Sequence, residues 1–309
     1  MSEMIDPTVQ APAGPVLDDS GTGKPMSKWT LYSRRFMRNK PAVAGIIIFV
    51  LLVLFAIFGP LIARYDHIEL DFLNLGTGPS ADHWFGTTAA GNDTFAQVAL
   101  GLQRSLMIAI TVSVGVTVLS AVIGTAAAYF GGWTEKVTLT VIHFMMVIPS
   151  FLILSLMSNR AGGNWIVISL IMVFIVGWYF PARVVWTTAL SLREREYVHA
   201  ARYMGVGGFR IVLRHLLPNI GSLLVINFTL GIVNAVMAET GLSFIGFGVK
   251  IPDVSLGSLI GTGANTITTA PWLFYFPAAA LTLLTVSMAL VSDGLRDALD
   301  PTSAAGGRA

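Results

Sequence analysis

The sequence of 309 residues contains no cysteine and little charge. The absence of cysteine excludes a disulfide framework, thiolate chemistry and any cysteine-ligated metal. Charged residues make up 12% of the chain, whereas ordinary soluble domains contain about 25%. More than half of the residues, 54%, are hydrophobic, and this is too much apolar surface for a soluble chain of this length to cover. The composition therefore predicts a polytopic membrane protein.

Long apolar runs predict six transmembrane helices, because a helix needs about 20 apolar residues to cross a bilayer. The runs cover residues 43–63, 106–130, 138–157, 165–187, 221–239 and 273–292. Most of the 19 Lys and Arg residues fall in the N-terminal tail and in the segments on the same side as that tail. Because positive charge favours the inner side of a membrane, both termini are predicted to be cytoplasmic.

The chain divides into four predicted parts. Residues 1–27 are rich in Pro, Gly, Ser and Thr and are predicted to be a disordered cytoplasmic tail. Residues 28–104 contain the first transmembrane helix and an outer loop, residues 105–300 contain a core of five further helices, and residues 301–309 are a flexible C-terminal tail. A second outer segment, 240–271, is rich in Gly yet apolar. It is either a lid or re-entrant element or an amphipathic surface loop.

An inner loop at 190–220 has the pattern of two short helices broken at Gly205–Gly208. In the first, Tyr197, Ala200, Ala201 and Met204 recur at helical spacing and form one face, where the two alanines would let another backbone approach closely. Such a face docks into a groove on a partner protein. An interfacial helix resting on lipid headgroups would have the same pattern. The residues alone leave both interpretations open.

Polar residues near the fifth span are candidates for the pathway or for helix packing. Asn227 and Asn234 lie seven residues apart and share a face, which belongs either to a pathway or subunit interface or to ordinary helix–helix contacts. Glu239 lies at the outer end of this span and could line the pathway or brace the lid. Ser243, one helical turn later, is grouped with it.

Motifs for catalysis are missing. Gly21-Thr-Gly-Lys24 is followed by Pro25 where a phosphate-binding loop requires Ser or Thr, so the chain is expected to have no ATPase of its own. No His-Glu-x-x-His pair occurs, and neither catalytic residues nor a metal site are expected. An ion-driven secondary transporter would require an inverted repeat and a broken helix with ion ligands, and no convincing repeat is found.

The inner loop resembles the EAA loop of ABC-importer permeases. Ala200, Ala201, Gly205, Leu217 and Pro218 match that motif at its spacing, and His199 replaces its glutamate. The flanking residues 193–198 and 215–219 are similar to the dipeptide/oligopeptide/nickel branch of the family. Three further blocks of the chain resemble that branch in the correct order, at 85–93, 239–248 and 293–301.

The resemblance implies an all-α, type I ABC importer permease fold with a cytoplasmic coupling helix and a long outer loop before the last span. It implies a function as one permease subunit, for oligopeptides or dipeptides, or alternatively for nickel or another small solute. The residues it assigns to ATPase coupling, within the segment 194–218, are Glu196, Tyr197, His199, Ala200, Ala201, Arg202, Met204, Gly205, Leu217 and Pro218.

The resemblance also implies the partners. They are a second homologous permease subunit, two cytoplasmic ABC ATPase subunits, an extracytoplasmic substrate-binding protein and membrane lipid, with no nucleic acid. ATP and Mg²⁺ would be bound by the ATPases, and this chain would hold no cofactor. The protein would lie in the cell membrane. Because His199 replaces a carboxylate, the cognate ATPase is expected to differ at that contact.

Overall fold

The computed structural model describes residues 28–160, 162–250 and 252–299, and within these ranges the named secondary-structure elements are all helices. Predictions for residues 1–27 and 301–309 lie outside this part of the chain. The helices are α1 (Lys28–Arg38), α2 (Lys40–Ile62), α3 (Thr94–Phe130), α4 (Gly132–Val147), α5 (Ser150–Arg160), α6 (Trp165–Ile171), α7 (Tyr179–Arg193), α8 (Glu196–Tyr203), α9 (Gly208–Ile211), α10 (Leu217–Asn219), α11 (Gly221–Phe244), α12 (Leu256–Ala264) and α13 (Trp272–Leu299). Two π-helical segments, η1 (Met172–Gly177) and η2 (Val212–Leu216), follow α6 and α9. The all-helical class is confirmed.

Four of these helices, α2, α3, α11 and α13, are each long and apolar enough to cross a membrane. Two other predicted spans are bent pairs. Helices α4 and α5 meet at 82°, and the helical segments 165–177 and 179–193 meet at 46°. Pro149 lies at the first break, where its ring and missing N–H interrupt a helix. The described chain thus has four straight candidate spans, and six if each bent pair counts as one.

Helix α3 is the central element of the bundle and packs against α2, α7 and α11. It begins where the Asp93 carboxylate accepts a hydrogen bond of 2.8 Å from the backbone N–H of Ala96, an N-cap. Its 37 residues run through the predicted division at residue 104 without a break. Gly124 lets α7 approach closely, since a Cβ there would lie 2.6 Å from the carbonyl oxygen of Ala182.

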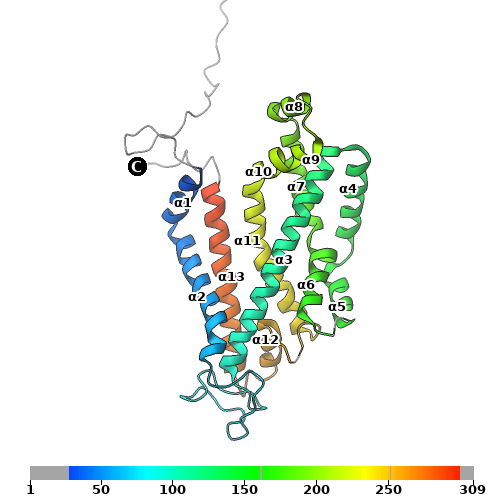
Figure 1. Ribbon diagram of the computed structural model, residues 1–309. Helices are drawn as coiled ribbons and strands as arrows, with labels where there is room; N and C mark the ends of the chain where they lie inside the picture. The colour runs from blue at the N-terminus through cyan, green and yellow to red at the C-terminus, as the bar shows by residue number, and fades with distance from the viewer. Residues whose placement is uncertain (1–27, 161, 251, 300–309) are drawn as a thin grey trace, which may run out of the picture.

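Helices α2 and α13 pack side by side at the edge of the bundle (Figure 1). Glycines set their spacing, as in many membrane helix pairs. A Cβ on Gly45 would lie 2.7 Å from the carbonyl oxygen of Ser287, and a Cβ on Gly294 would collide with Ala42. The first span is therefore fixed to the last one, far away in sequence.

The two ends of the bundle differ in character (Figure 1). At one end lie α1, the last turns of α13 and the segment that contains α8. At the other lie the loop between α2 and α3 and helix α12. The segment 240–271, predicted as a loop or lid, is partly helical, because α11 continues to Phe244 and α12 packs on α3, α11 and α13.

Candidate functional site

In the segment from Arg193 to Asn219, helix α8 projects beyond the ends of α3 and α7 (Figure 1). After α8 the backbone of Gly205 has a φ of 78°, a conformation that glycine adopts without strain. The chain then resumes as α9 and continues through η2 and α10. The predicted pair of short helices with a break ending at Gly208 is confirmed.

The two alanines of the motif point in different directions. Ala201 is 2% exposed and packs with Val198 in a small apolar cluster that includes Tyr129 of α3. Ala200 is exposed. The prediction that both alanines share an outward face is wrong, because successive residues on a helix differ by about 100° in direction.

The outward surface of this segment is apolar at its tip. Tyr203 is 88% exposed and Met204 is 76% exposed, and Phe209 is also exposed. Of the other residues assigned to coupling, Tyr197, Glu196, Arg202, Gly205 and Pro218 are exposed, whereas His199 and Leu217 are half-buried. Large exposed apolar side chains at one end of a bundle mark a surface that contacts a partner.

Arg193 ties the segment to the end of α3. Its Nη1 donates a hydrogen bond of 2.8 Å to the carbonyl oxygen of Ala128, and its Nε lies 2.8 Å from Oε1 of Glu194. The hydrogen bond and the charge of Arg193 lower the pKa of Glu194 below its usual value. Gly208 completes the contact, because a Cβ there would lie 2.7 Å from the Tyr129 ring.

His199, the departure from the motif, has an acidic neighbour within the same segment. Its Nε2 lies 3.6 Å from Oε2 of Glu194. Glu194 is thus paired with both Arg193 and His199. This pairing was not predicted from the sequence.

A cavity of about 290 Å³ lies in the middle of the bundle between α3, α5, η1, α7 and α11. Asn227 and Asn234 both line it, which confirms that they share a face, and Ser113 and Thr117 of α3 add hydroxyls. Among the described residues Asn227 Nδ2 has no hydrogen-bond partner although it is buried. The rest of the lining is mainly aliphatic, with no charged side chain.

Glu239 and Ser243 do not line this cavity. Glu239 is 0% exposed, and its Oε1 accepts hydrogen bonds of 2.6 Å from the hydroxyls of Ser243 and Ser255. Ser255 is the N-cap of α12. Gly257 brings α12 onto α11 at this point, since a Cβ there would lie 2.6 Å from Thr240 Cα. Gly261, one turn later, also lies against α11, since a Cβ there would lie 3.2 Å from Phe244 Cα.

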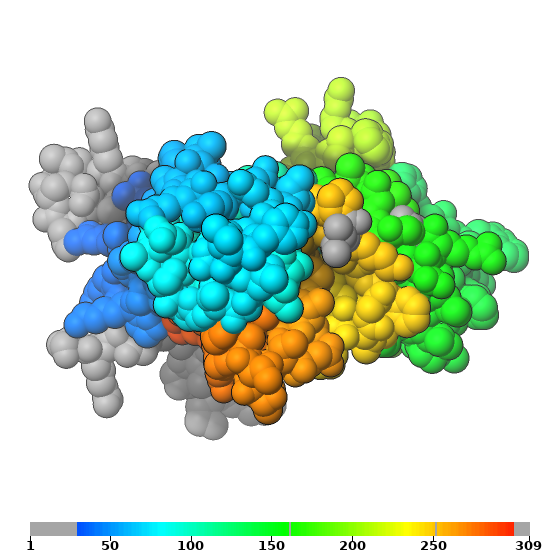
Figure 2. All heavy atoms as spheres, turned by 90° about the horizontal axis from the view of Figure 1, so that it is seen from below, coloured from blue at the N-terminus to red at the C-terminus, as the bar shows by residue number. Residues whose placement is uncertain are grey.

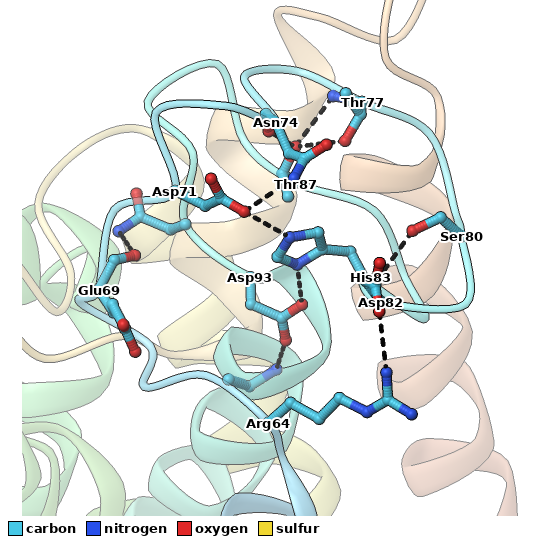
Figure 3. Close-up of polar contacts among 12 residues, drawn as sticks. Arg64, Glu69, Asp71, Asn74, Thr77, Ser80, Asp82, His83, Thr87 and Asp93 are labelled. Atoms are coloured by element: carbon cyan, nitrogen blue, oxygen red, sulfur yellow. Dashed lines mark hydrogen bonds and ion pairs between the residues drawn. The ribbon is translucent and has the colours of Figure 1, made fainter.

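The loop between α2 and α3 contains a polar network that sequence reasoning missed (Figure 3). The buried ring of His83 has Nδ1 2.9 Å from Asp93 Oδ1 and Nε2 3.2 Å from Asp71 Oδ2. Tyr65 stacks on the ring at 4.5 Å. Asp93 also caps α3, so the network fixes this loop to the start of the central helix. The sequence feature that could have predicted this network is a histidine with acidic residues on both sides of it in one loop.

Comparisons with known proteins agree on the type of protein that this chain resembles. Residues 120–304 match the family model described as binding-protein-dependent transport system inner membrane component, and residues 27–77 match the N-terminal TM domain of oligopeptide transport permease C. The chain is 42% identical to the oligopeptide transport system permease protein OppC of Mycobacterium tuberculosis strain H37Rv, over 90% of this chain and 96% of that protein.

Two further relatives come from other bacteria. The OppC protein of Bacillus subtilis is 34% identical over 90% of this chain and 91% of its own length. The dipeptide transport system permease protein DppC of Alkalihalophilus pseudofirmus is 32% identical over 94% of each chain. The similarity thus covers nearly the full length of these proteins.

Proposed function

This chain belongs to the family of binding-protein-dependent transport system inner membrane components, and from this premise we propose that it is a permease subunit of a peptide ABC importer. The family is one of transport components and not of enzymes. In this proposal the chain forms half of the translocation pathway, and a second homologous permease subunit forms the other half. The observation that carries the proposal is the exposed apolar tip of the segment around α8.

The α8 end is proposed to face the cytoplasm. It carries five arginines between residues 193 and 214, namely Arg193, Arg195, Arg202, Arg210 and Arg214. The opposite end carries fewer basic residues, among them Arg64 and Lys250. The excess of positive charge favours the inner side, which also places α1 and the end of α13 there (Figure 1).

In the proposed mechanism α8 docks into a cleft on one of two ABC ATPase subunits. Tyr203 and Met204 supply the exposed contact, while Val198 and Ala201 fix the helix to the rest of the chain. ATP and Mg²⁺ bind to the ATPase subunits, and closure of those subunits displaces α8. The Arg193–Ala128 hydrogen bond passes this displacement to α3.

The cavity lined by Asn227 and Asn234 is the proposed part of the pathway in this subunit. Its neutral amides and hydroxyls can hydrogen-bond to the main chain of a peptide without holding it tightly. Nickel prefers imidazole ligands, and the residues lining this cavity include no histidine and no carboxylate. The lining therefore supports a peptide substrate over a metal ion. An extracytoplasmic substrate-binding protein would deliver the peptide.

The test is uptake of a labelled tripeptide into vesicles that contain this chain, the second permease subunit and both ATPases, with the binding protein added. Uptake should require ATP and should stop when the ATPases are omitted. Replacing both Asn227 and Asn234 with Leu should abolish uptake, whereas Asn159→Leu, at an exposed position outside the cavity, should leave it unchanged. Uptake driven by an ion gradient without ATPases would refute the proposal.

A further inference from the structure

A second and larger pocket, of about 670 Å³, lies at the end of the molecule opposite α8. Its walls come from the loop before α3, the first turns of α3, the segment before α12, α12 with Thr266 after it, and the start of α13. The lining residues of the two loop segments are Thr88, Ala89, Ala90, Asn92, Val249, Lys250, Asp253 and Val254. Figure 2 looks onto this end and shows the loop before α3, in cyan, directly beside the orange segment of α12. The pocket shares no lining residue with the cavity around Asn227.

The walls are rich in hydrogen-bond acceptors. The hydroxyls of Thr262 and Thr266 donate to carbonyl oxygens within their own segment, so their oxygen lone pairs remain available. The side-chain amide of Gln97 donates to the carbonyl oxygen of His67, and its Oε1 has no partner among the described residues. An array of acceptors of this kind suits a ligand with several N–H groups.

One residue of the pocket wall has an unpaired hydroxyl. Thr94 Oγ1 is buried and has no hydrogen-bond partner in the described part of the chain. Leaving a buried hydroxyl unpaired is costly. Thr94 is one of the residues that line the pocket, so this unpaired hydroxyl belongs to the pocket wall. A ligand in the pocket could therefore supply the hydrogen-bond partner that Thr94 Oγ1 lacks.

The charge at the rim favours an anionic group. Asp253 is paired with Arg104, whose Nε lies 3.0 Å from Asp253 Oδ1. Lys250 is exposed and makes no ion pair within the described ranges. With Asp253 neutralised, Lys250 leaves the rim with a net positive charge.

We propose that this pocket binds a short peptide, with its C-terminal carboxylate toward Lys250 and its main-chain N–H groups toward Gln97, Thr262 and Thr266. Apolar residues, among them Val98 and Leu259, would receive a side chain. The volume falls within the range of small-ligand sites, which is why a peptide is favoured over a loop of a partner protein. The substrate class rests on the proposed function, and the site is additional to the cavity between the helices.

The experiment uses the assembled importer in lipid nanodiscs without the binding protein. The probe is trialanine extended by one photoreactive benzoylphenylalanine, and labelled peptides are mapped by mass spectrometry. Labelling is expected within residues 88–97 and 258–266 and should be competed by unlabelled trialanine. Thr262→Trp, which fills the pocket, should reduce labelling there to background. Thr268→Trp, an exposed position that does not line the pocket, is the matched control and should label normally.

A second variant tests the carboxylate contact and does not depend on filling the pocket. Lys250→Gln should weaken competition by trialanine about threefold, the size expected for an exposed ion pair. It should leave competition by C-terminally amidated trialanine unchanged. Labelling confined to residues around Asn227, equal labelling of the Thr262→Trp and Thr268→Trp proteins, or equal effects of Lys250→Gln on both peptides would overturn the site.

The two proposals fail separately. If ATP-driven tripeptide uptake occurs but these pocket results are negative, the outer site is refuted and the importer function stands. If the pocket binds trialanine and yet no ATP-driven peptide uptake occurs, the proposed function fails. Crosslinks that form only when the binding protein is present, and that join the pocket to that protein, would identify the site as a docking surface and overturn peptide binding.

Discussion

The hydroxyl of Ser255 donates a hydrogen bond of 2.6 Å to Oε1 of Glu239, and Ser255 is at the same time the N-cap of α12. The same oxygen accepts from Ser243. The backbone N–H of Leu256 in turn donates to Ser105 Oγ, at 3.1 Å, so α3 joins the contact. Glu239 therefore braces α12 against the bundle, which was one of the two roles that the sequence left open.

Removing this carboxylate should destabilise the protein. Glu239→Ala leaves two buried hydroxyls without their acceptor and should lower the free energy of unfolding by about 2 kcal/mol or more. Glu239→Gln keeps one acceptor oxygen and should lose less. Thermal unfolding of the purified chain in nanodiscs measures both, and an unchanged midpoint for the alanine variant would contradict the bracing role.

The close contact between α11 and α12 at Gly257 should not tolerate an added methyl group. Gly257→Ala places a Cβ 2.6 Å from Thr240 Cα, so the helices must separate, at a cost of about 1–3 kcal/mol. Gly221→Ala is the control, since nothing lies within 4 Å of a Cβ there. The same unfolding measurement applies. Equal unfolding midpoints for the two variants would show that α11 and α12 are not closely packed at Gly257.

The two alanines of the coupling motif should respond differently to enlargement. Ala201→Leu overfills a buried cluster and should destabilise the segment around α8, seen as faster amide hydrogen exchange at residues 196–216. Ala200→Leu, on the exposed side, should leave exchange unchanged and weaken co-purification with the ATPase. If both variants bind the ATPase normally, α8 is not the docking element.

His83 should make the loop between α2 and α3 more stable in mild acid. Burial alone lowers the pKa of His83, but its hydrogen bonds and charge interactions with Asp93 and Asp71 outweigh burial, and the pKa is raised above 6.5. Neutral imidazole can donate to only one of the two carboxylates. The stabilisation is therefore complete below pH 6.5 and is lost as pH rises through the raised pKa.

Hydrogen exchange of residues 65–93 at pH 6 and pH 8.5, corrected for intrinsic rates, measures this dependence. Protection should be greater at pH 6 in the natural chain, and His83→Gln should remove most of the difference. A variant with the same pH dependence as the natural chain would exclude His83 as its origin.

His199 should determine which ATPase binds. His199→Glu restores the glutamate of the motif but places it next to Glu194, so two carboxylates would repel each other. We expect weaker binding to the cognate ATPase and partial recovery in the double variant with Glu194→Ser. Binding is measured by co-purification and titration in nanodiscs. Full affinity of the natural chain for an ATPase from a relative with the usual glutamate would contradict this prediction.

The long helices were predictable because their signal is local. A run of apolar residues such as 43–63 is sufficient to predict α2, and the match with Lys40–Ile62 is within three residues at each end. Asn227 and Asn234 could be placed on one face from their spacing alone. The proposal that residues 194–218 contact an ATPase came from Ala200, Gly205 and Pro218 together, since the amphipathic pattern alone also fitted a lipid-bound helix.

Other features depend on contacts that a linear pattern does not contain. The inward turn of Ala201 is set by packing against Tyr129, about 70 residues earlier in the chain. In the stretch after α8, Phe209 and Leu213 are exposed whereas Val212 and Leu216 are buried. Part of this stretch, η2, is wound as a π-helix, so the 3.6-residue period of an α-helix does not describe it. The His83 network joins residues of a loop that has no periodicity.

The length of helix α3 and its contacts at both ends have a consequence for how movement passes through the molecule. With 37 residues it is about 55 Å long. It is capped by Asp93 at one end and fixed to Arg193 through Ala128 near the other. If the helix tilts as a rigid body about its middle, a tilt of about 5° moves each end by about 2 Å in opposite directions. A small displacement of α3 at the α8 end would thus move the loop that contains His83 through this one helix.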